Sequence, residues 1–144
     1  MRRVDPRTGI EVLDRAQCLE LLAEHEIGRL GVVTGGEPDI FPVNYALDGS
    51  AIVVRTADGT KSAAAGHAAA CFEVDDFDRE RRGGWSVVVH GRLEAIDPTS
   101  GPVWERITRL PVDPWTGSAK PRWLRLTPVR ISGRRVPGTS SPRD

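Results

Sequence analysis

The sequence of 144 residues lacks the features of membrane, secreted or strongly charged proteins. No apolar run approaches the roughly 18 residues that a membrane helix needs, and no apolar stretch follows the basic N-terminus, as it would in a signal peptide. The two cysteines, Cys18 and Cys71, are too few for a disulfide framework. Twenty basic residues balance twenty acidic ones, so no net charge attracts nucleic acid or anionic lipid. We therefore expect a cytoplasmic protein with no nucleic-acid or membrane partner.

Side-chain signatures of catalysis and metal binding are also missing. The three histidines, His25, His67 and His90, lack the spacing of a metal site, and Ser86 lacks the glycines that flank a hydrolase nucleophile. The chain has neither a Walker loop nor a glycine motif for dinucleotides. We therefore expect no catalytic side chain and no metal, and any redox chemistry would come from a bound cofactor.

The composition is that of one globular domain. Apolar residues make up 39% of the chain and charged residues 28%, and the length allows a single core. We expect one domain over residues 1–136. Residues 137–144 are rich in proline and serine and are expected to form a disordered tail.

Short β-like segments separated by turn residues dominate the chain. Six strands are expected, at residues 27–34, 39–47, 51–56, 70–74, 85–96 and 122–131. The first three form an antiparallel meander, with a Gly-Gly turn at residues 35 and 36 and an Asp-Gly turn at residues 48 and 49. The apolar pattern of the last strand changes phase at Pro128, which predicts a bulge. Residues 75–84 are charged, end in two glycines and predict a loop.

Helices are expected at three places. Asp14 and Gln17 form a capping-box pattern, so the first ordered element should be a helix that begins at Asp14 and ends near Gly28. Further helices are expected at the alanine-rich residues 61–70 and at residues 102–110. Six strands with short helices indicate a mainly β fold of the α+β class, a small antiparallel barrel with helical covers.

One segment carries the parts of a phosphate site. Residues 55–61 place Arg55 and Thr56 at the end of a strand and Thr60 and Lys61 at the start of a helix. The two cations, the hydroxyl groups and the free amides of a helix N-terminus all suit a phosphate monoester. A solvated turn with ordinary surface charges is the competing interpretation.

Three further segments are compatible with a ligand site. Pro42 interrupts an expected strand, which indicates either a plain edge strand or an edge that borders a ligand or a second subunit. Asn44 offers both a donor and an acceptor to a heterocycle. Trp85 and Ser86 follow a Gly-Gly turn, and Trp115 lies in an irregular stretch rich in proline. Tryptophans in such places either fill a core or stack on a ligand.

The order and spacing of these segments resemble the pyridoxamine 5′-phosphate oxidase-like, FMN-binding split-barrel proteins. The likeness covers residues 12–135 and is greatest to the short actinobacterial-type members related to nitroimidazole-resistance proteins. It is carried by IGRL at 27–30, PVNY at 42–45, VRT at 54–56, GTK at 59–61, FEVD at 72–75 and GWSVVVHG at 84–91. The resemblance implies a six-stranded antiparallel split β-barrel with short covering helices.

The resemblance also implies a homodimer with two FMN molecules at its interface. The residues assigned to that site share strand ends or adjoining turns, and they are Val43, Asn44, Arg55, Thr56, Thr60, Lys61, Trp85, Ser86 and Trp115. The two cations and two threonines would hold the FMN phosphate and neighbouring atoms. Val43 and Asn44 would line the flavin ring, and the two tryptophans with Ser86 would close the site, partly from the second subunit.

The chain departs from the pyridoxamine phosphate oxidases after residues 125–128, Arg-Leu-Thr-Pro. The aromatic pair and the histidine with which those enzymes hold their substrate are missing, so oxidation of vitamin B6 is not expected. The expected function is an FMN-dependent reductase that acts with a small-molecule electron donor or acceptor. Two alternatives stay open. One is a deazaflavin coenzyme, whose anionic tail would suit basic residues such as Arg134 and Arg135, and the other is a non-catalytic role in binding flavin or haem.

Overall fold

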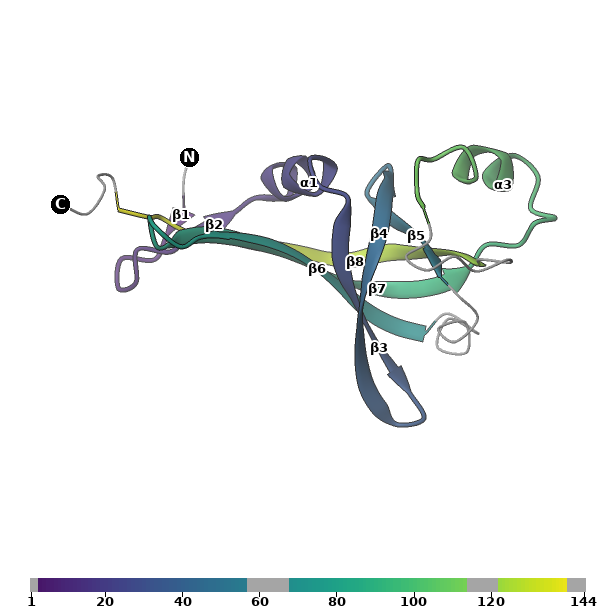
Figure 1. The fold of residues 1–144 in the computed structure, drawn as a ribbon, viewed down its shortest axis with the longest axis horizontal. Coiled ribbons are helices and arrows are strands. Elements are labelled where there is room, and N and C mark those ends of the chain that lie inside the picture. Colours follow the sequence, from purple (N-terminus) through teal and green to yellow (C-terminus); the bar gives the residue numbers. More distant parts are fainter. Residues whose placement is uncertain (1–2, 57–67, 114–121, 140–144) are drawn as a thin grey trace.

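The computed structural model describes residues 3–56, 68–113 and 122–139. Within these ranges, eight strands form one antiparallel sheet, accompanied by two helices (Figure 1). Six of the strands make the barrel: β3 (Ile27–Thr34), β4 (Glu37–Asp48), β5 (Ala51–Thr56), β6 (Ala68–Asp78), β7 (Gly83–Ala95) and β8 (Arg122–Val136). The other elements are β1 (Arg3–Val4), β2 (Glu11–Leu13), α1 (Arg15–Ala23) and α3 (Pro102–Ile107).

The six long strands close into a ring. They lie in the order β8, β5, β4, β3, β6, β7, and β7 pairs again with β8. The contact between β3 and β6 is the shortest in the ring and pairs Arg29 to Gly31 with Glu73 to Cys71. The ring confirms the six-stranded antiparallel split barrel, and β3, β4 and β5 form the expected meander.

Alternate residues of the strands point into the barrel. In β7 the residues Val87, Val89, Gly91 and Leu93 are buried, as their shared face predicts, and they pack with Leu30, Phe72, Leu124 and Leu126. Helix α1 adds Cys18 and Leu22 to this core. A second, smaller cluster lies on the outer side, where Ile107 of α3 packs against Val53 of β5 and Ile96. The two helices thus cover different parts of the barrel.

The turns of the meander depend on glycine. Gly35 and Gly36 join β3 to β4 with φ angles of 59° and 82°, which favour glycine. Between β4 and β5, Asp48 still pairs with Ala51, so the turn residues are Gly49 and Ser50, one position later than predicted. Gly49 has a φ of 62°, the conformation that a tight hairpin needs at its first turn residue.

The predicted bulge is present in β8. His90 of β7 pairs with Arg130, but the next residue, Gly91, pairs with Pro128. Val129 is the extra residue and is 77% exposed. The bulge shifts the buried face from even to odd positions, which explains the change of phase in the sequence.

Proline in β4 is accommodated by the shape of the sheet. Pro42 does not interrupt the strand but lies within it, in register with Arg29 of β3. On its other side, β4 pairs with β5 only from Tyr45 to Asp48. Pro42 therefore lies in the part of β4 that has no partner in β5. The N–H group that proline lacks is not needed there for a hydrogen bond to β5.

The start and end of the first helix were predicted with mixed success. Its capping box is confirmed, because Asp14 Oδ1 accepts a hydrogen bond from the Gln17 amide at 2.8 Å and Gln17 Oε1 accepts one from the Asp14 amide at 2.9 Å. Asp14 does not begin the first ordered element, since β1 and β2 precede it. The helix ends at Ala23 rather than near Gly28, because pairing with β4 already begins at Ile27 and places Gly28 inside β3.

The prediction of a loop at residues 75–84 is wrong. Strands β6 and β7 pair without interruption up to Asp78 and Gly83 and leave only a short turn. This ribbon projects to one side of the barrel together with β1, β2 and the end of β8, as Figure 1 shows. Residues 75–78 are exposed, which explains why a paired strand is rich in charge here.

Other boundaries also differ from the predictions. Strand β8 continues to Val136 because its last residues pair with β2 and β7. Of the predicted helix at residues 61–70, the last three residues belong to β6, and the remainder lies outside the described residues, as do residues 140–144 of the predicted tail. Neither helix in the described ranges is long and apolar enough to cross a membrane.

Candidate functional site

Arg55 and Thr56 end β5 beside the small outer cluster. Arg55 is in register with Trp123 of β8, and its guanidinium carbon lies 4.8 Å from the centroid of the Trp123 ring. Arg55 Nη1 donates a hydrogen bond to the Val112 carbonyl at 3.0 Å. The aromatic face and the carbonyl hold the planar guanidinium in one orientation.

Two polar atoms at this strand end are buried without a partner. Arg55 Nε and Thr56 Oγ1 have no hydrogen bond within the part of the chain that the structure describes. Arg125 Nε shares this property, but the Arg125 guanidinium lies 3.5 Å from an Asp48 carboxylate oxygen and 3.0 Å from one of Glu94. Among the described residues no carboxylate forms an ion pair with Arg55. Buried polar groups are normally paired, so this strand end suits an anionic acceptor.

A short segment after α3 crosses the same strand end. We call residues 111–113 the strap. Its carbonyls accept hydrogen bonds from Arg55 and also from Asn44, whose Nδ2 lies 3.0 Å from the Asp113 oxygen. The strap thereby brings Asn44 of β4 and Arg55 of β5 into one polar site. Val112 itself is buried, with 3% of its surface exposed.

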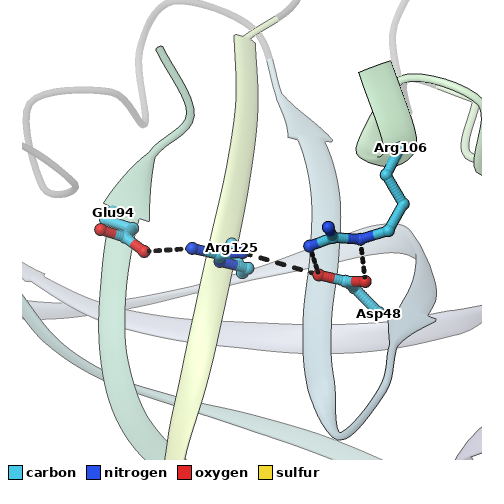
Figure 2. A network of polar contacts seen from close by, with 4 residues as sticks. All are labelled: Asp48, Glu94, Arg106 and Arg125. Atoms are coloured by element: carbon cyan, nitrogen blue, oxygen red, sulfur yellow. Dashed lines mark hydrogen bonds and ion pairs between the residues drawn. The ribbon is translucent and has the colours of Figure 1, made fainter. Parts of the chain in front are cut away.

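A charged network joins α3 to the sheet (Figure 2). Asp48 at the end of β4 accepts two hydrogen bonds from Arg106 of α3, at 2.9 and 3.0 Å. Arg125 of β8 bridges Asp48 and Glu94 of β7. The hydrogen bonds from Arg106, with the nearby positive charges, hold the pKa of Asp48 below its usual value in spite of partial burial.

The other predicted site residues lie away from Arg55 or outside the described residues. Val43 is buried in the core, so only its backbone is available to a ligand on the outer side. Trp85 packs edge-on against His25, with ring centroids 4.9 Å apart, and neighbours Ser86 on β7. Thr60, Lys61 and Trp115 lie outside the described residues.

Within one chain, Trp85 and Ser86 are far from Arg55. Arg55 is in register with Trp123, whereas Trp85 is in register with Arg135 near the other end of β8. At roughly 3.3 Å per residue, this separation is on the order of 35 Å. The structure therefore brings together Asn44, Arg55 and Thr56, and it keeps Trp85 and Ser86 apart from them.

Three contributors to the site were not anticipated from the sequence. The carbonyls of Val112 and Asp113 act through the backbone, which has no signature in the sequence. Trp123 could have been found, because it alternates with the buried residues Leu124 and Leu126 at the start of β8 and must therefore face outward. Among the described residues, no group of three or more histidines, cysteines or carboxylates could hold a metal ion.

Known proteins are similar to this chain over most of its length. An uncharacterized protein of Mycobacterium tuberculosis, Rv0080, is 31% identical over 94% of this chain and 92% of its own length. A crystal structure from Corynebacterium glutamicum, provisionally identified as a pyridoxamine 5′-phosphate oxidase, is 30% identical, with a TM-score of 0.77, over 92% of this chain and 96% of its own.

An FAD-binding protein from Mycobacterium smegmatis has a similar structure. It is 33% identical, with a TM-score of 0.73, over 87% of this chain and 98% of its own. A sequence profile of the family described as pyridoxamine 5′-phosphate oxidase matches residues 14–135. The match covers the six barrel strands except for the last residue of β8, and the chain therefore belongs to the pyridoxamine 5′-phosphate oxidase family.

Proposed function

We propose that the chain binds a flavin, FMN, by its phosphate at Arg55 and Thr56, and that it serves as a flavin-dependent reductase. The observation that carries the proposal is the pair of buried, unpartnered atoms Arg55 Nε and Thr56 Oγ1. A phosphate group has several oxygens that can each accept a hydrogen bond from such a donor, and its charge compensates the guanidinium. The donor set thus fits the phosphate end of a flavin nucleotide.

The relatives support the choice of a flavin. The Mycobacterium smegmatis protein of similar structure is an FAD-binding protein. FAD contains the whole of FMN, so a site for the FMN phosphate is compatible with either nucleotide. We favour FMN because the resemblance of the sequence to the FMN-binding split-barrel proteins implies it. Thr60, Lys61 and Trp115 keep their expected roles within this proposal.

In this proposal the flavin supplies the redox chemistry and the side chains of the protein bind the flavin. A flavin, when bound, supplies hydride and electron transfer at its ring. Arg55 and Thr56 hold the phosphate, Trp123 supports the guanidinium, and the Asn44 amide lies beside them on β4. The proposal requires no catalytic side chain.

Titration with flavins tests the binding site directly. FMN and FAD are added to the purified chain, and binding is followed by flavin absorbance and fluorescence. Replacing Arg55 with methionine should weaken FMN binding by about 10-fold or more, the effect of a lost hydrogen bond to a charged group. Arg15→Met removes the same charge from the exposed surface of α1 and should leave binding unchanged. Absence of binding by the natural sequence, or equal binding by Arg55→Met, would overturn the proposal.

The same preparation separates the alternative functions. A deazaflavin coenzyme is titrated in parallel, and tighter binding than FMN would favour that coenzyme. The spectrum of the isolated protein distinguishes flavin from haem by the strong Soret band of haem. Reduction of the bound flavin by a nicotinamide donor supports the reductase, whereas a flavin that no donor reduces favours a non-catalytic role.

We further propose that the working unit is a homodimer. Trp85 and Ser86 lie on the order of 35 Å from Arg55 by strand register, so only a second copy could bring them to the same flavin. The outer side of the barrel offers an apolar surface for this purpose, where Val33 and Ile40 are 59% and 65% exposed and line a groove together with Gly31. Sedimentation equilibrium of the natural sequence and of Ile40→Lys tests it, and a monomeric natural protein would contradict it.

A further inference from the structure

We propose that Asp48 and Arg106 are positioning residues for the cofactor site. In this proposal their ion pair places α3, α3 places the strap, and the strap orients the Arg55 guanidinium. The inference rests on the proposed flavin site, because it assigns the phosphate to Arg55. None of the four residues of the charged network is itself assigned to the ligand.

The first step is the attachment of α3 to the sheet. Arg106 forms a bidentate pair with Asp48, and Arg125 ties Asp48 to Glu94 on β7 (Figure 2). The Asp48 side chain is only 16% exposed, so these contacts are shielded from solvent on the Asp48 side. Burial of Ile107 against Val53 and Ile96 fixes the same helix on its apolar face.

The second step leads from α3 to the strap. The Leu110 amide donates to the Ile107 carbonyl at 3.0 Å, and the Val112 amide donates to the Leu110 carbonyl at 2.8 Å. No free stretch of chain separates the helix end from the strap. A shift of α3 must therefore move the Val112 and Asp113 carbonyls.

The third step leads from the strap to the ligand. Arg55 Nη1 and Asn44 Nδ2 donate to these two carbonyls, each at 3.0 Å. The bond to Val112 and the Trp123 ring restrict the guanidinium to the orientation in which Nε is buried without a partner among the described residues. Loss of the strap contact would let the guanidinium rotate, and binding would then have to order it again.

Asp48→Asn is the variant that tests this chain of contacts. It keeps the shape of the side chain at the hairpin end but removes the charge that pairs with Arg106 and Arg125. We expect the Kd for FMN to rise about 2- to 5-fold, the range for a partly exposed ion pair. Arg106→Gln removes the other partner and should have the same effect, and it provides a second variant if Asp48→Asn folds poorly.

The Arg55→Lys background distinguishes positioning from general damage. Lysine keeps the charge but cannot bond to the strap and stack on Trp123 in the same way. If the network acts through Arg55, Asp48→Asn should cause no further loss of FMN affinity in the Arg55→Lys protein. Equal losses in both backgrounds, or no loss in either, would overturn the inference.

Arg29→Gln is the matched control. Arg29 is 49% exposed and pairs with Glu73 at 3.1 Å, whereas Arg106 is 53% exposed and pairs with Asp48 at 2.9 Å. Within the described part of the chain, Arg29 pairs with Glu73 and Asp75 and forms no ion pair or hydrogen bond with α3 or the strap. The FMN affinity of Arg29→Gln should equal that of the natural sequence, and an equal loss in this variant would overturn the inference.

A measurement without flavin separates this inference from the proposed function. The Arg55 Nε–H signal in a ¹⁵N correlation spectrum is assigned by its absence from Arg55→Lys. In Asp48→Asn this signal should shift and exchange faster with water, because the guanidinium is less restricted. An unchanged signal would overturn the positioning role. Failure of the natural sequence to bind any flavin would overturn only the assignment of the ligand.

Discussion

The ring of Phe72 occupies the space that a Cβ atom on Gly28 would need. Such an atom would lie 2.8 Å from Cε1 and 2.9 Å from Cε2 of Phe72. The ring cannot move aside freely, because it is fully buried and meets the Tyr45 ring edge-on at 4.9 Å. Gly28→Ala should therefore lower the free energy of unfolding by about 1–3 kcal/mol, as overpacking does. Denaturant unfolding measures the loss.

A second substitution tests the cause of this loss. Phe72→Leu removes the ring that competes with the new methyl group, although it also costs core packing on its own. The loss in Gly28→Ala/Phe72→Leu should be smaller than the sum of the losses in the single variants. Additive losses would show that the methyl group and the ring do not compete for one space.

The capping box of α1 contributes to stability. Asp14 satisfies the Gln17 amide, and Gln17 satisfies the Asp14 amide in return. Asp14→Ala should lower the free energy of unfolding by about 0.5–2 kcal/mol. Arg15→Ala, at an exposed neighbouring position, serves as the control in the same unfolding experiment. Equal stability of the two variants would contradict a capping role.

Glu73 makes stability depend on pH. Burial, and next the hydrogen bond and charge of Asp75, raise the pKa of Glu73 to about 7, although Arg29 acts in the opposite direction. From about pH 4.5 to 7 the Glu73 carboxyl is deprotonated in the unfolded chain but still protonated in the folded chain. The Glu73 contribution to the free energy of unfolding therefore falls as the pH rises through this window.

Glu73→Gln removes that titration. The stability of this variant relative to the natural sequence should increase from pH 5 to pH 8, as measured by denaturant unfolding at both values. Asp75→Asn should reduce the pH dependence of the natural sequence, because it removes the neighbouring acid. A difference between Glu73→Gln and the natural sequence that stays constant with pH would show that Glu73 titrates as an ordinary carboxyl.

A buried hydroxyl ties α1 to the barrel. Tyr45 Oη donates a hydrogen bond to the Leu22 carbonyl, and burial raises the pKa of Tyr45 well above its usual value. Tyr45→Phe should lower the free energy of unfolding by about 1 kcal/mol or slightly more, since Leu22 loses its best donor. Amide hydrogen exchange of residues 15–23 should accelerate more than that of β7. Uniform acceleration would indicate general destabilisation instead.

The barrel could be predicted because its signals are local. Asp14 and Gln17 carry their capping pattern within one turn, and the change of phase at Pro128 marks the bulge directly. Strands β1 and β2 have no such signal. They are two and three residues long and depend on pairing with one another and with the distant end of β8, between residues 133 and 135.

The candidate site was predictable only in part. Arg55 and Thr56 were predicted as phosphate ligands because a basic strand end beside hydroxyl groups suits a phosphate, and the structure adds that Arg55 Nε and Thr56 Oγ1 are buried without a partner among the described residues. The strap was missed because its contribution comes from backbone carbonyls. Whether Trp85 and Ser86 belong to the same site depends on a second copy, and no pattern within one chain specifies how two copies pack.

The position of β8 in the ring has a consequence for how the protein is made. This strand pairs with β2, β5 and β7, so it contacts both ends of the open sheet. During synthesis on the ribosome, β3 to β7 emerge before β8. The edges of β5 and β7 that pair with β8 in the finished barrel therefore stay unpaired until β8 has been synthesised. Such distant pairings are slow to form. The nascent chain therefore passes through an interval in which the edges of β5 and β7 are open to pairing with other strands.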